Sequence, residues 1–197
     1  ITRNLPQTAM VVTEGFRDAI EIGRSTKKDL WDAYEDNPPP YIRRRDRLPF
    51  PERTDASGEI TVSVDESSAH ELAKRLRKRG YEAVTICFMN SFANPENERV
   101  MRRILEDELP DVAISNSADV LCEIFEHDRF SSAVVNAVVH PVIGAYALRL
   151  QDQLLDGGYA NDLLLLHSGG GVMTPHTVAQ QGARLAGSGI AAGAVAS

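Results

Sequence analysis

Short apolar runs recur along the chain at the spacing expected of strands that alternate with helices. Residues 8–13 and 82–89 are largely apolar runs of strand length, as is typical of strands covered on both faces. Residues 59–64 alternate between apolar and polar side chains, 111–115 form another short run, and 162–168 (DLLLLHS) form a further buried strand. This order predicts an α/β fold, with a mixed sheet covered by helices.

Helical periodicity fills the intervals between these runs. A helix over 65–80 is predicted with Asp65 as its N-cap, and another begins at Asn94-Pro95. A helix over 14–24 is predicted to follow Thr13, which would be its N-cap. These helices are expected to cover the faces of the sheet.

One helix stands out by its length. The helical pattern continues over 125–158, where Gly157-Gly158 end it. Pro141 should kink this long helix, because its ring removes an amide donor and crowds the preceding turn. A short helix over 174–181 (TPHTVAQQ) is predicted further along.

A proline-rich segment interrupts the first part of the chain. Residues 32–58 contain five prolines, which forbid a regular helix and predict an extended connection that wraps the surface. The basic stretch YIRRRDR (41–47) could dock on another subunit, with Trp31 and Tyr34 as anchors.

Composition and charge narrow the class of protein. Hydrophobic residues make up 43% and charged residues 25% of 197 residues, as in folded domains. The net charge of −7 argues against nonspecific nucleic-acid binding, and no apolar run approaches the ~20 residues that cross a bilayer. Cys87 and Cys122 are interpreted as buried thiols in a reducing cytoplasm, and the histidines lack metal-ligand spacing, so no metal site is predicted. Because the chain begins without Met and stops inside a small-residue helix, we expect an internal piece of a longer protein.

Two glycine-rich stretches could approach a ligand. Ser168, Gly169, Gly170 and Gly171 follow a predicted strand, and either make a tight turn or offer bare amides to an anion. The second stretch, 187–193 (GSGIAAG), opens a helix, but a dinucleotide fingerprint needs a strand before it and an acidic residue about twenty positions on, and the sequence ends before that position. Backbone approach to a phosphate at Ser188 and Gly189 is therefore favoured over an NAD-binding module.

A polar cluster marks the start of the long helix. Glu126, His127, Asp128 and Arg129 could supply an acid, a base and an anion clamp. Successive helical residues point in different directions, so a capped and solvated helix start is the alternative. His167, on a predicted buried strand, is interpreted as a core histidine.

Five motifs together resemble one family. They are VVTEGFRDAIEIGR (11–24), NSFANPENE (90–98), LCEIFEHDRFSSAVVNAVVHPVIGAY (121–146), HSGGGVMT (167–174) and GSGIAAGAV (187–195). In this order they resemble the hydantoinase A/5-oxoprolinase family. That family includes ATP-dependent hydantoinases, 5-oxoprolinase and subunits of acetone and acetophenone carboxylases.

The resemblance implies a fold, a chemistry and a domain division. The fold would be like that of actin-like ATPases, with nucleotide between two ribonuclease-H-like domains. Residues 1–121 would be the C-terminal part of the family's N-terminal domain, and 122–197 the beginning of the hydantoinase/oxoprolinase core domain. The intact protein would use ATP and Mg²⁺ to phosphorylate a cyclic amide or ketone. The family's two Asp-x-Gly-Gly-Thr phosphate loops are absent, so the fragment alone should be inactive.

Site residues and partners follow from the same resemblance. The residues expected at the interdomain cleft are Arg129, Ser168, Gly169, Gly170, Gly171, Ser188 and Gly189. The expected partners are a small-molecule substrate, a companion hydantoinase B-type subunit and further copies of the chain. The alternative is a non-catalytic scaffold that binds a partner subunit through 36–53. Asn97 stands where the family usually has His, and Ile190 where it has Pro, which favours the carboxylase-related branch.

Overall fold

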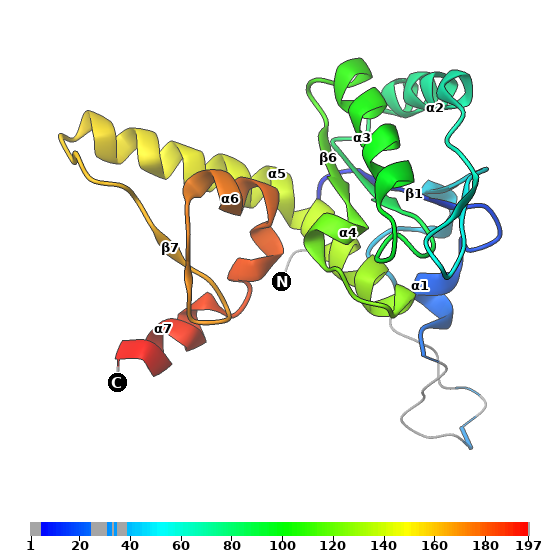
Figure 1. Cartoon of the computed structure of the whole chain (residues 1–197). Helices are drawn as coiled ribbons and strands as arrows, with labels where there is room; N and C mark the ends of the chain where they lie inside the picture. The colour runs from blue at the N-terminus through cyan, green and yellow to red at the C-terminus, as the bar shows by residue number, and fades with distance from the viewer. Residues whose placement is uncertain (1–4, 25–30, 33, 35–38, 197) are drawn as a thin grey trace. The chain divides into compact units, whose positions relative to one another are not determined.

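The computed structural model describes residues 5–24, 31, 32, 34 and 39–196 (Figure 1). The described chain has two compact units: a larger unit, 7–137, and a smaller unit that comprises 138–196 together with Leu5 and Pro6. Residues 33 and 35–38 of the predicted surface connection, which include the start of the stretch 36–53, lie outside the described residues.

A four-stranded sheet forms the centre of the larger unit. Its strands are β1 (Thr8–Thr13), β2 (Arg47–Phe50), β5 (Ala83–Cys87) and β6 (Ala113–Asn116), in the order β2-β1-β5-β6. Every neighbouring pair in this sheet is parallel. The chain leaves β1 for β2 on one side and returns to β5 on the other, so its winding direction reverses between β1 and β5.

Helices cover both faces of this sheet, as Figure 1 shows. On one face, α2 (Glu66–Arg79) and α3 (Glu96–Glu108) pack against alternate residues of β1, among them Ala9 and Val11. On the other face, α1 (Ala19–Ile22) and the start of α5 (Glu126–Asp156) pack against Met10 and Val12. Burial on both faces explains why β1 and β5 are largely apolar.

The signals that begin and end the middle helices are confirmed. Asp65 accepts a hydrogen bond from the Ser68 amide at 2.7 Å, and Gly80 ends α2 in the left-handed region. Asn94 accepts from the amide of Glu96 at 3.1 Å, and Pro95 occupies the N-cap of α3, one position earlier than predicted.

The predicted helix over 14–24 is mostly wrong. Only α1 is helical, and its N-cap is Asp18. Thr13 ends β1, and its hydroxyl accepts from the amide of Met89 at 2.8 Å and donates to Glu52. Because these bonds hold the Thr13 side chain at the end of the sheet, it cannot cap a helix. Gly15 then turns the chain with φ of +88°.

The proline-rich segment contributes a strand to the sheet, which the sequence prediction missed. A short 3₁₀ turn at Arg44–Asp46 leads into β2, where Pro49 pairs with Val12 of β1. An edge strand tolerates proline because one of its sides needs no amide donor. The predicted strand over 59–64 is only β4 (Ile60–Val62), which pairs with β3 (Arg53–Thr54) in a separate antiparallel ribbon.

The long helix α5 extends through Pro141 and belongs to both units. Gly157 and Gly158 follow its end, as predicted. Among the described residues it is the one helix long and apolar enough to cross a membrane, with a mean hydropathy of 1.4 in its most apolar window. A core helix of a soluble protein meets the same test, so the length and hydropathy of α5 do not by themselves identify a membrane span.

The smaller unit is built on the second part of α5. It adds a hairpin of β7 (Leu165–Leu166) and β8 (Val172–Met173), followed by α6 (Pro175–Gln180), a 3₁₀ turn (Gly182–Leu185) and α7 (Ser188–Ala196). Thr174 caps α6 through the Thr177 amide at 3.2 Å. The expected buried strand over 162–168 is wrong in extent and burial, since β7 is two residues long and half-buried.

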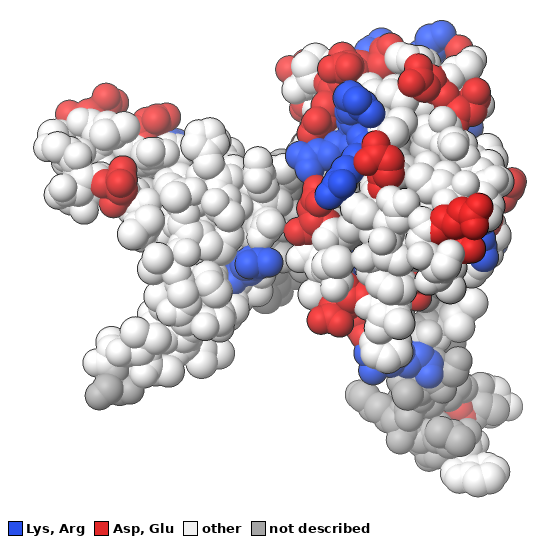
Figure 2. All heavy atoms as spheres, viewed as in Figure 1, with Lys and Arg blue, Asp and Glu red and all other residues white. Residues whose placement is uncertain are grey.

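Charge is distributed differently over the two units. On the face shown in Figure 2, positive and negative side chains of the larger unit are intermixed. Arg102, for example, pairs with Glu106 at 2.7 Å and with Asp119 at 3.0 Å. The part of the chain from 138 onward has few charged residues, which are Arg149, Asp152, Asp156, Asp162 and Arg184. No large single-sign surface is seen on this face.

One cysteine departs from its predicted environment. Cys87 is fully buried in β5, and burial strongly raises the pKa of its thiol. Cys122 is exposed, because it lies in the loop between α4 (Ser117–Val120) and α5. Both thiols are free.

The unequal burial of α5 gives a test of the fold. Phe130 is completely buried under the sheet, whereas Val142 is 63% exposed. Phe130→Ala should lower the free energy of unfolding by about 3–5 kcal/mol, and Val142→Ala should change it by less than about 0.5 kcal/mol. Urea melting followed by circular dichroism measures both, and equal losses would contradict the packing of α5 described here.

Candidate functional site

A cavity opens where the winding direction of the parallel sheet reverses. Ligands of α/β proteins bind at this position, outside the carboxyl ends of the strands. Here β1 is followed by residues 14–18 and β5 by residues 88–90. The cavity has a volume of about 630 Å³ and is lined by residues of 15–24, by Met89 and by 125–127.

Most of the cavity wall is apolar. Phe16, Ala19 and Ile22 come from the segment around α1, and Met89 follows β5. Phe125 immediately precedes α5 and is 58% exposed. Residues of two motifs that are far apart in sequence, VVTEGFRDAIEIGR and EIFEHDRF, thus line the same cavity.

A buried arginine positions α1 beside this cavity. Arg47 is 1% exposed, and its guanidinium contacts Glu21 at 2.6 Å and Asp18 at 3.4 Å. Asp18 also pairs with Arg44 at 2.9 Å, and this hydrogen bond holds the pKa of the Asp18 carboxyl below its usual value. The basic stretch 41–47 therefore anchors α1 to the edge strand, a role that the sequence pattern did not indicate.

The charged groups at the cavity are paired within the protein. Arg24 pairs with Asp128 and lies over the ring of Phe125, 4.7 Å from its centroid. Glu126 pairs with Arg129 at 3.2 Å and accepts from the amide of Asn90 at 3.4 Å. His127 differs, because its Nδ1 is buried and has no hydrogen-bond partner among the described residues.

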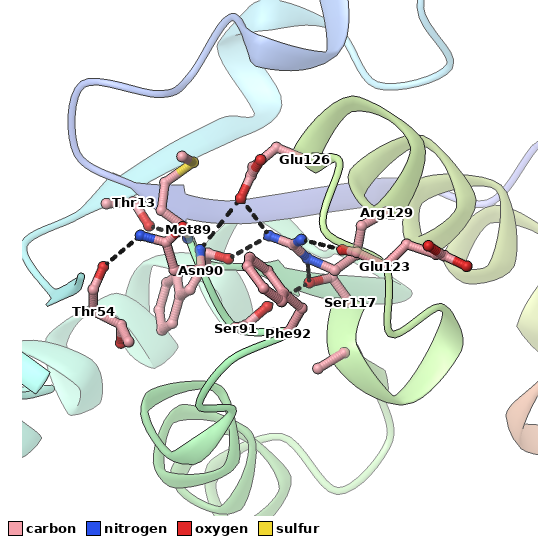
Figure 3. A network of polar contacts seen from close by, with 12 residues as sticks. Thr13, Thr54, Met89, Asn90, Ser91, Phe92, Ser117, Glu123, Glu126 and Arg129 are labelled. Atoms are coloured by element: carbon pink, nitrogen blue, oxygen red, sulfur yellow. Dashed lines mark hydrogen bonds and ion pairs between the residues drawn. The ribbon is translucent and has the colours of Figure 1, made fainter. Parts of the chain in front are cut away.

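Arg129 holds the loops behind the cavity together (Figure 3). Its side chain is fully buried and donates to the carbonyls of Glu123 at 2.6 Å and Phe88 at 3.2 Å, and to Ser117 Oγ at 3.3 Å. Arg129 therefore faces the interior of the larger unit, and lines no open surface among the described residues. The sequence led us to expect Arg129 at the surface of a cleft, and its complete burial in the larger unit differs from that expectation.

Glu98 balances the charge of Arg129 in the same interior. Its carboxylate accepts from Ser117 Oγ at 2.6 Å and from the amides of Phe88 at 2.9 Å and Ala118 at 3.0 Å. Burial raises the pKa of Glu98 to about 7, and the three hydrogen bonds and Arg129 oppose that rise.

A second buried carboxylate lies at the end of β1. Glu52 accepts from Thr13 and, at 2.8 Å, from the amide nitrogen of Asn97. Burial raises the pKa of Glu52. Asn97 also donates to the carbonyl of Val62 at 3.1 Å and accepts from the amide of Val64 at 3.3 Å. Asn97, which stands where the family usually has His, thus joins the β3–β4 ribbon to the sheet.

In the smaller unit, the three glycines turn a hairpin. The amide of His167 donates to the carbonyl of Gly171, and that of Gly170 to the carbonyl of His167, both at 2.9 Å. Gly170 has φ of +82°, as expected of the last residue in a three-residue hairpin loop. A Cβ at Gly169 or Gly171 would lie 2.9 or 2.6 Å from the ring of His167. The positive φ of Gly170 and the close approach of His167 to Gly169 and Gly171 therefore explain why this turn contains three glycines.

His167 and Ser168 fix this turn to its neighbours. His167 is half-buried rather than in a core, and its Nδ1 accepts from the amide of Gly169 at 3.0 Å. Ser168 Oγ donates to the carbonyl of Arg184 at 2.6 Å and accepts from the amide of Gly187 at 2.8 Å.

The structure brings most of the predicted site residues together. Ser168, at the start of the glycine turn, contacts Gly187 just before α7, which starts at Ser188 and Gly189. Arg129 belongs to the larger unit and is not part of this group. A role for any of them in nucleotide or substrate binding stays a prediction. The cavity at 15–24 was missed, although both motifs that line it carried the family resemblance.

The fold and cavity define an α/β protein whose candidate site lies at the carboxyl ends of parallel strands. The chain belongs to the hydantoinase/oxoprolinase family. Residues 1–109 match the hydantoinase/oxoprolinase N-terminal region, and residues 129–197 match the hydantoinase/oxoprolinase domain.

Three relatives illustrate the breadth of the family. An uncharacterised protein of Methanocaldococcus jannaschii is 34% identical over 98% of the chain. The acetophenone carboxylase gamma subunit of Aromatoleum aromaticum is 28% identical over 87%, and the caprolactamase alpha subunit of Pseudomonas jessenii is 29% identical over 84%. The chain spans 28%, 25% and 24% of the lengths of these relatives, about a quarter of each.

Solved structures confirm the expected fold class. The nucleotide-free structure of acetone carboxylase superposes with a TM-score of 0.83 and 23% identity, covering 98% of this chain and 29% of that one. The crystal structure of ATP-dependent caprolactamase from Pseudomonas jessenii has a TM-score of 0.78 and 28% identity, covering 87% and 25%. The fold is α/β, with a helix-covered sheet and one long helix.

The buried carboxylate Glu98 predicts a pH dependence of stability. Its pKa is about 7 in the folded protein and 4.5 as the unfolded reference, so the folded state favours the protonated form. This contribution is full below pH 4.5 and is lost as the pH rises to about 7, by up to about 3 kcal/mol. Glu98→Gln should therefore flatten the fall in stability between these pH values. Urea melts of both proteins measure it, and parallel pH profiles would contradict the shift; Glu52 is present in both and cancels.

The hairpin predicts how Gly170→Ala acts in the intact protein. Its positive φ should make the substitution cost roughly 1–2 kcal/mol of stability. If the turn also faces a ligand, the KM for ATP or substrate should rise about tenfold, which needs only about 1.4 kcal/mol. Gly80→Ala is the matched control, because Gly80 also has positive φ and open space at its Cβ position. Normal kinetics in both variants would contradict a ligand-binding role and would show that the glycines serve only to form the turn.

Proposed function

We propose that this chain is part of an ATP-dependent enzyme that acts on a cyclic amide or a ketone. The observation that carries the proposal is family membership, since two sequence models of the family match residues 1–109 and 129–197. The relatives include a carboxylase subunit and a caprolactamase subunit, and a solved relative is described as an ATP-dependent caprolactamase.

The finer proposal is activation of the substrate by phosphorylation. Amide and ketone oxygens are poor leaving groups, and a phosphoryl group makes such an oxygen a better one. Phosphoryl transfer needs charge neutralisation, usually by Mg²⁺ and cationic side chains. The cavity of the larger unit offers little charge neutralisation to a phosphoryl group, because Arg24 is paired with Asp128 and the carboxylates of Asp18 and Glu126 line the same cavity.

Nucleotide and metal would accordingly be held mainly by other parts of the intact protein. Among the described residues, no three or more His, Cys, Asp or Glu side chains are grouped so as to hold a metal ion. We place the protein in the cytoplasm, with a companion B-type subunit and further copies of the chain as partners. The names of the carboxylase and caprolactamase relatives as subunits support the partner subunit.

A non-catalytic scaffold is the second proposal. Trp31 and Tyr34 are 92% and 94% exposed, as anchors for a partner subunit would be before assembly. Such anchors are expected of a scaffold and equally of an enzyme that has a partner subunit. Catalysis in the intact protein separates the two.

The test is ATP turnover by the intact protein with a panel of neutral cyclic amides and small ketones, with and without bicarbonate. At least one panel member should raise ATP hydrolysis by about tenfold or more and be consumed, as expected when substrate binding completes the reactive arrangement. The 197-residue chain alone should hydrolyse no ATP above background. Turnover that no panel member changes would favour the scaffold.

A further inference from the structure

The β-hairpin of the smaller unit is packed on one face. Side chains alternate along a strand, and Leu165 and Met173, which pair across the hairpin, pack in the core cluster that α5 and α6 complete. Their neighbours Leu164 and Val172 are 53% and 59% exposed. The second face of the hairpin is therefore apolar, and no described residue covers it fully.

Helix α7 is also apolar and exposed. It has no buried residue, and Ile190 and Val195 are 83% and 66% exposed. The helix lies beside the hairpin, because a Cβ on Gly170 would be 3.7 Å from Cγ2 of Val195. The two elements thus expose apolar side chains in the same part of the smaller unit.

Charge is nearly absent from this part of the chain. Between residues 163 and 196 the sequence has one charged side chain, that of Arg184. Exposed apolar side chains without charges between them are typical of a surface that another segment or protein covers. We refer to four of them as the apolar face: Leu164, Val172, Ile190 and Val195.

The smaller unit has little core of its own. Among the described residues its buried cluster contains Ala147, Met173 and Val178, with three partly buried side chains packed against them. A domain of about 60 residues is marginally stable even when it buries about 60% of its unfolded surface, and an isolated two-stranded hairpin is marginal in water. These constraints favour a unit that further chain completes.

Strand β7 has the features of a strand with a second neighbour. Leucine occupies every position from 163 to 166, and an uninterrupted apolar run is typical of a strand buried on both faces. Among the described residues β7 pairs with β8 alone. The amide of His167 donates across the hairpin to Gly171, so strand alternation directs the amide of Leu166 to the opposite edge. Such an edge is a template for another strand.

Further chain of the same polypeptide is the occupant that these observations favour. The present chain spans 28%, 25% and 24% of the lengths of three relatives, so most of such a protein lies outside it. A segment of the same polypeptide has a high effective concentration, whereas a second copy or a separate protein must also offset the entropy of association. The apolar face also lacks the charges that steer and select a separate partner.

We infer that a β-strand of the intact protein, from outside residues 1–197, pairs with the free edge of β7, and that apolar side chains of the same outside chain cover the apolar face. β7 then becomes an inner strand of a larger sheet, and the turn 168–171 follows an inner strand. The inference does not depend on the proposed function, because it concerns how the smaller unit is completed and not what the protein catalyses.

Hydrogen exchange in the unsubstituted intact protein tests the added strand. Residue-resolved mass spectrometry measures the exchange rate of the Leu166 amide. If another strand pairs with β7, this amide should exchange at least about tenfold more slowly than in an unstructured peptide. The amide of His167, which is bonded within the hairpin, is the control that shows the hairpin is formed. Exchange of the Leu166 amide within about tenfold of the unstructured rate would overturn the inference.

Cysteine labelling tests the cover. Leu164→Cys and Ile190→Cys are introduced one at a time into the intact protein, and peptide mass spectrometry measures how fast a maleimide labels each thiol in the native protein and in urea. Covered thiols should react at least about tenfold more slowly in the native protein. Lys74→Cys, on the exposed side of α2, is the control and should react similarly in both. Equal native and unfolded rates at both 164 and 190 would contradict the cover.

Photo-crosslinking identifies the occupant. Photo-leucine, incorporated in place of leucine, is activated in the intact protein, and peptides linked to 163–166 are sequenced by mass spectrometry. A link within one polypeptide leaves the denatured chain at monomer mass, whereas a link to a second copy doubles that mass. The expected product has monomer mass and joins 163–166 to a peptide from outside residues 1–197.

The other crosslinking outcomes decide against the inference. A product of doubled mass would assign the surface to a contact between copies, and a peptide of another protein would assign it to a partner subunit. A link only to residues within 1–197 would show that this chain covers the surface itself. None of these measurements uses ATP or a substrate, so their failure leaves the proposed function untouched, and loss of ATP turnover would leave this inference untouched.

Discussion

The loops behind the candidate site depend on a buried cation, Arg129. Arg129 has no exposed surface, and a buried guanidinium is stable only when its donors and its charge are satisfied. Its partners are the carbonyls of Phe88 and Glu123, the hydroxyl of Ser117 and the carboxylate of Glu126. They lie in chain segments that the parallel sheet does not order, so Arg129 sets the shape of the loops at the carboxyl end of β5.

The loop after β5 shows how tightly this arrangement is specified. The amide of Phe88 donates to Glu98 and its carbonyl accepts from Arg129, so two buried charged groups satisfy the backbone where the strand ends. Asn90 then adopts φ of +57°, which a small amide side chain tolerates, and its side chain donates to the carbonyl of Thr54 at 2.9 Å. Met89, between these two residues, is thereby directed to the cavity wall.

Local signals predicted the elements whose determinants are local. The run 82–89 and the caps at Asp65 and Gly80 depend on neighbours in sequence, and they agree with the structure. Thr13 and Pro49 were misassigned because their roles depend on distant partners, Glu52 for Thr13 and an edge position beside β1 for Pro49. The cavity could not be derived from periodicity, since it requires residues around α1 to meet the start of α5.

The polar cluster at the start of α5 shows why composition alone left its role open. Glu126 and His127 line the cavity, Asp128 pairs with Arg24, and Arg129 is directed into the interior. Helical geometry separates consecutive side chains by about 100°, so these residues cannot all act on one ligand. Because their side chains point in different directions, these residues serve different purposes within one turn of α5. Glu126 and His127 line the cavity, Asp128 forms an ion pair with Arg24 beside it, and Arg129 holds the loops behind it. That division explains why Arg129 can set the shape of the site without lining the cavity.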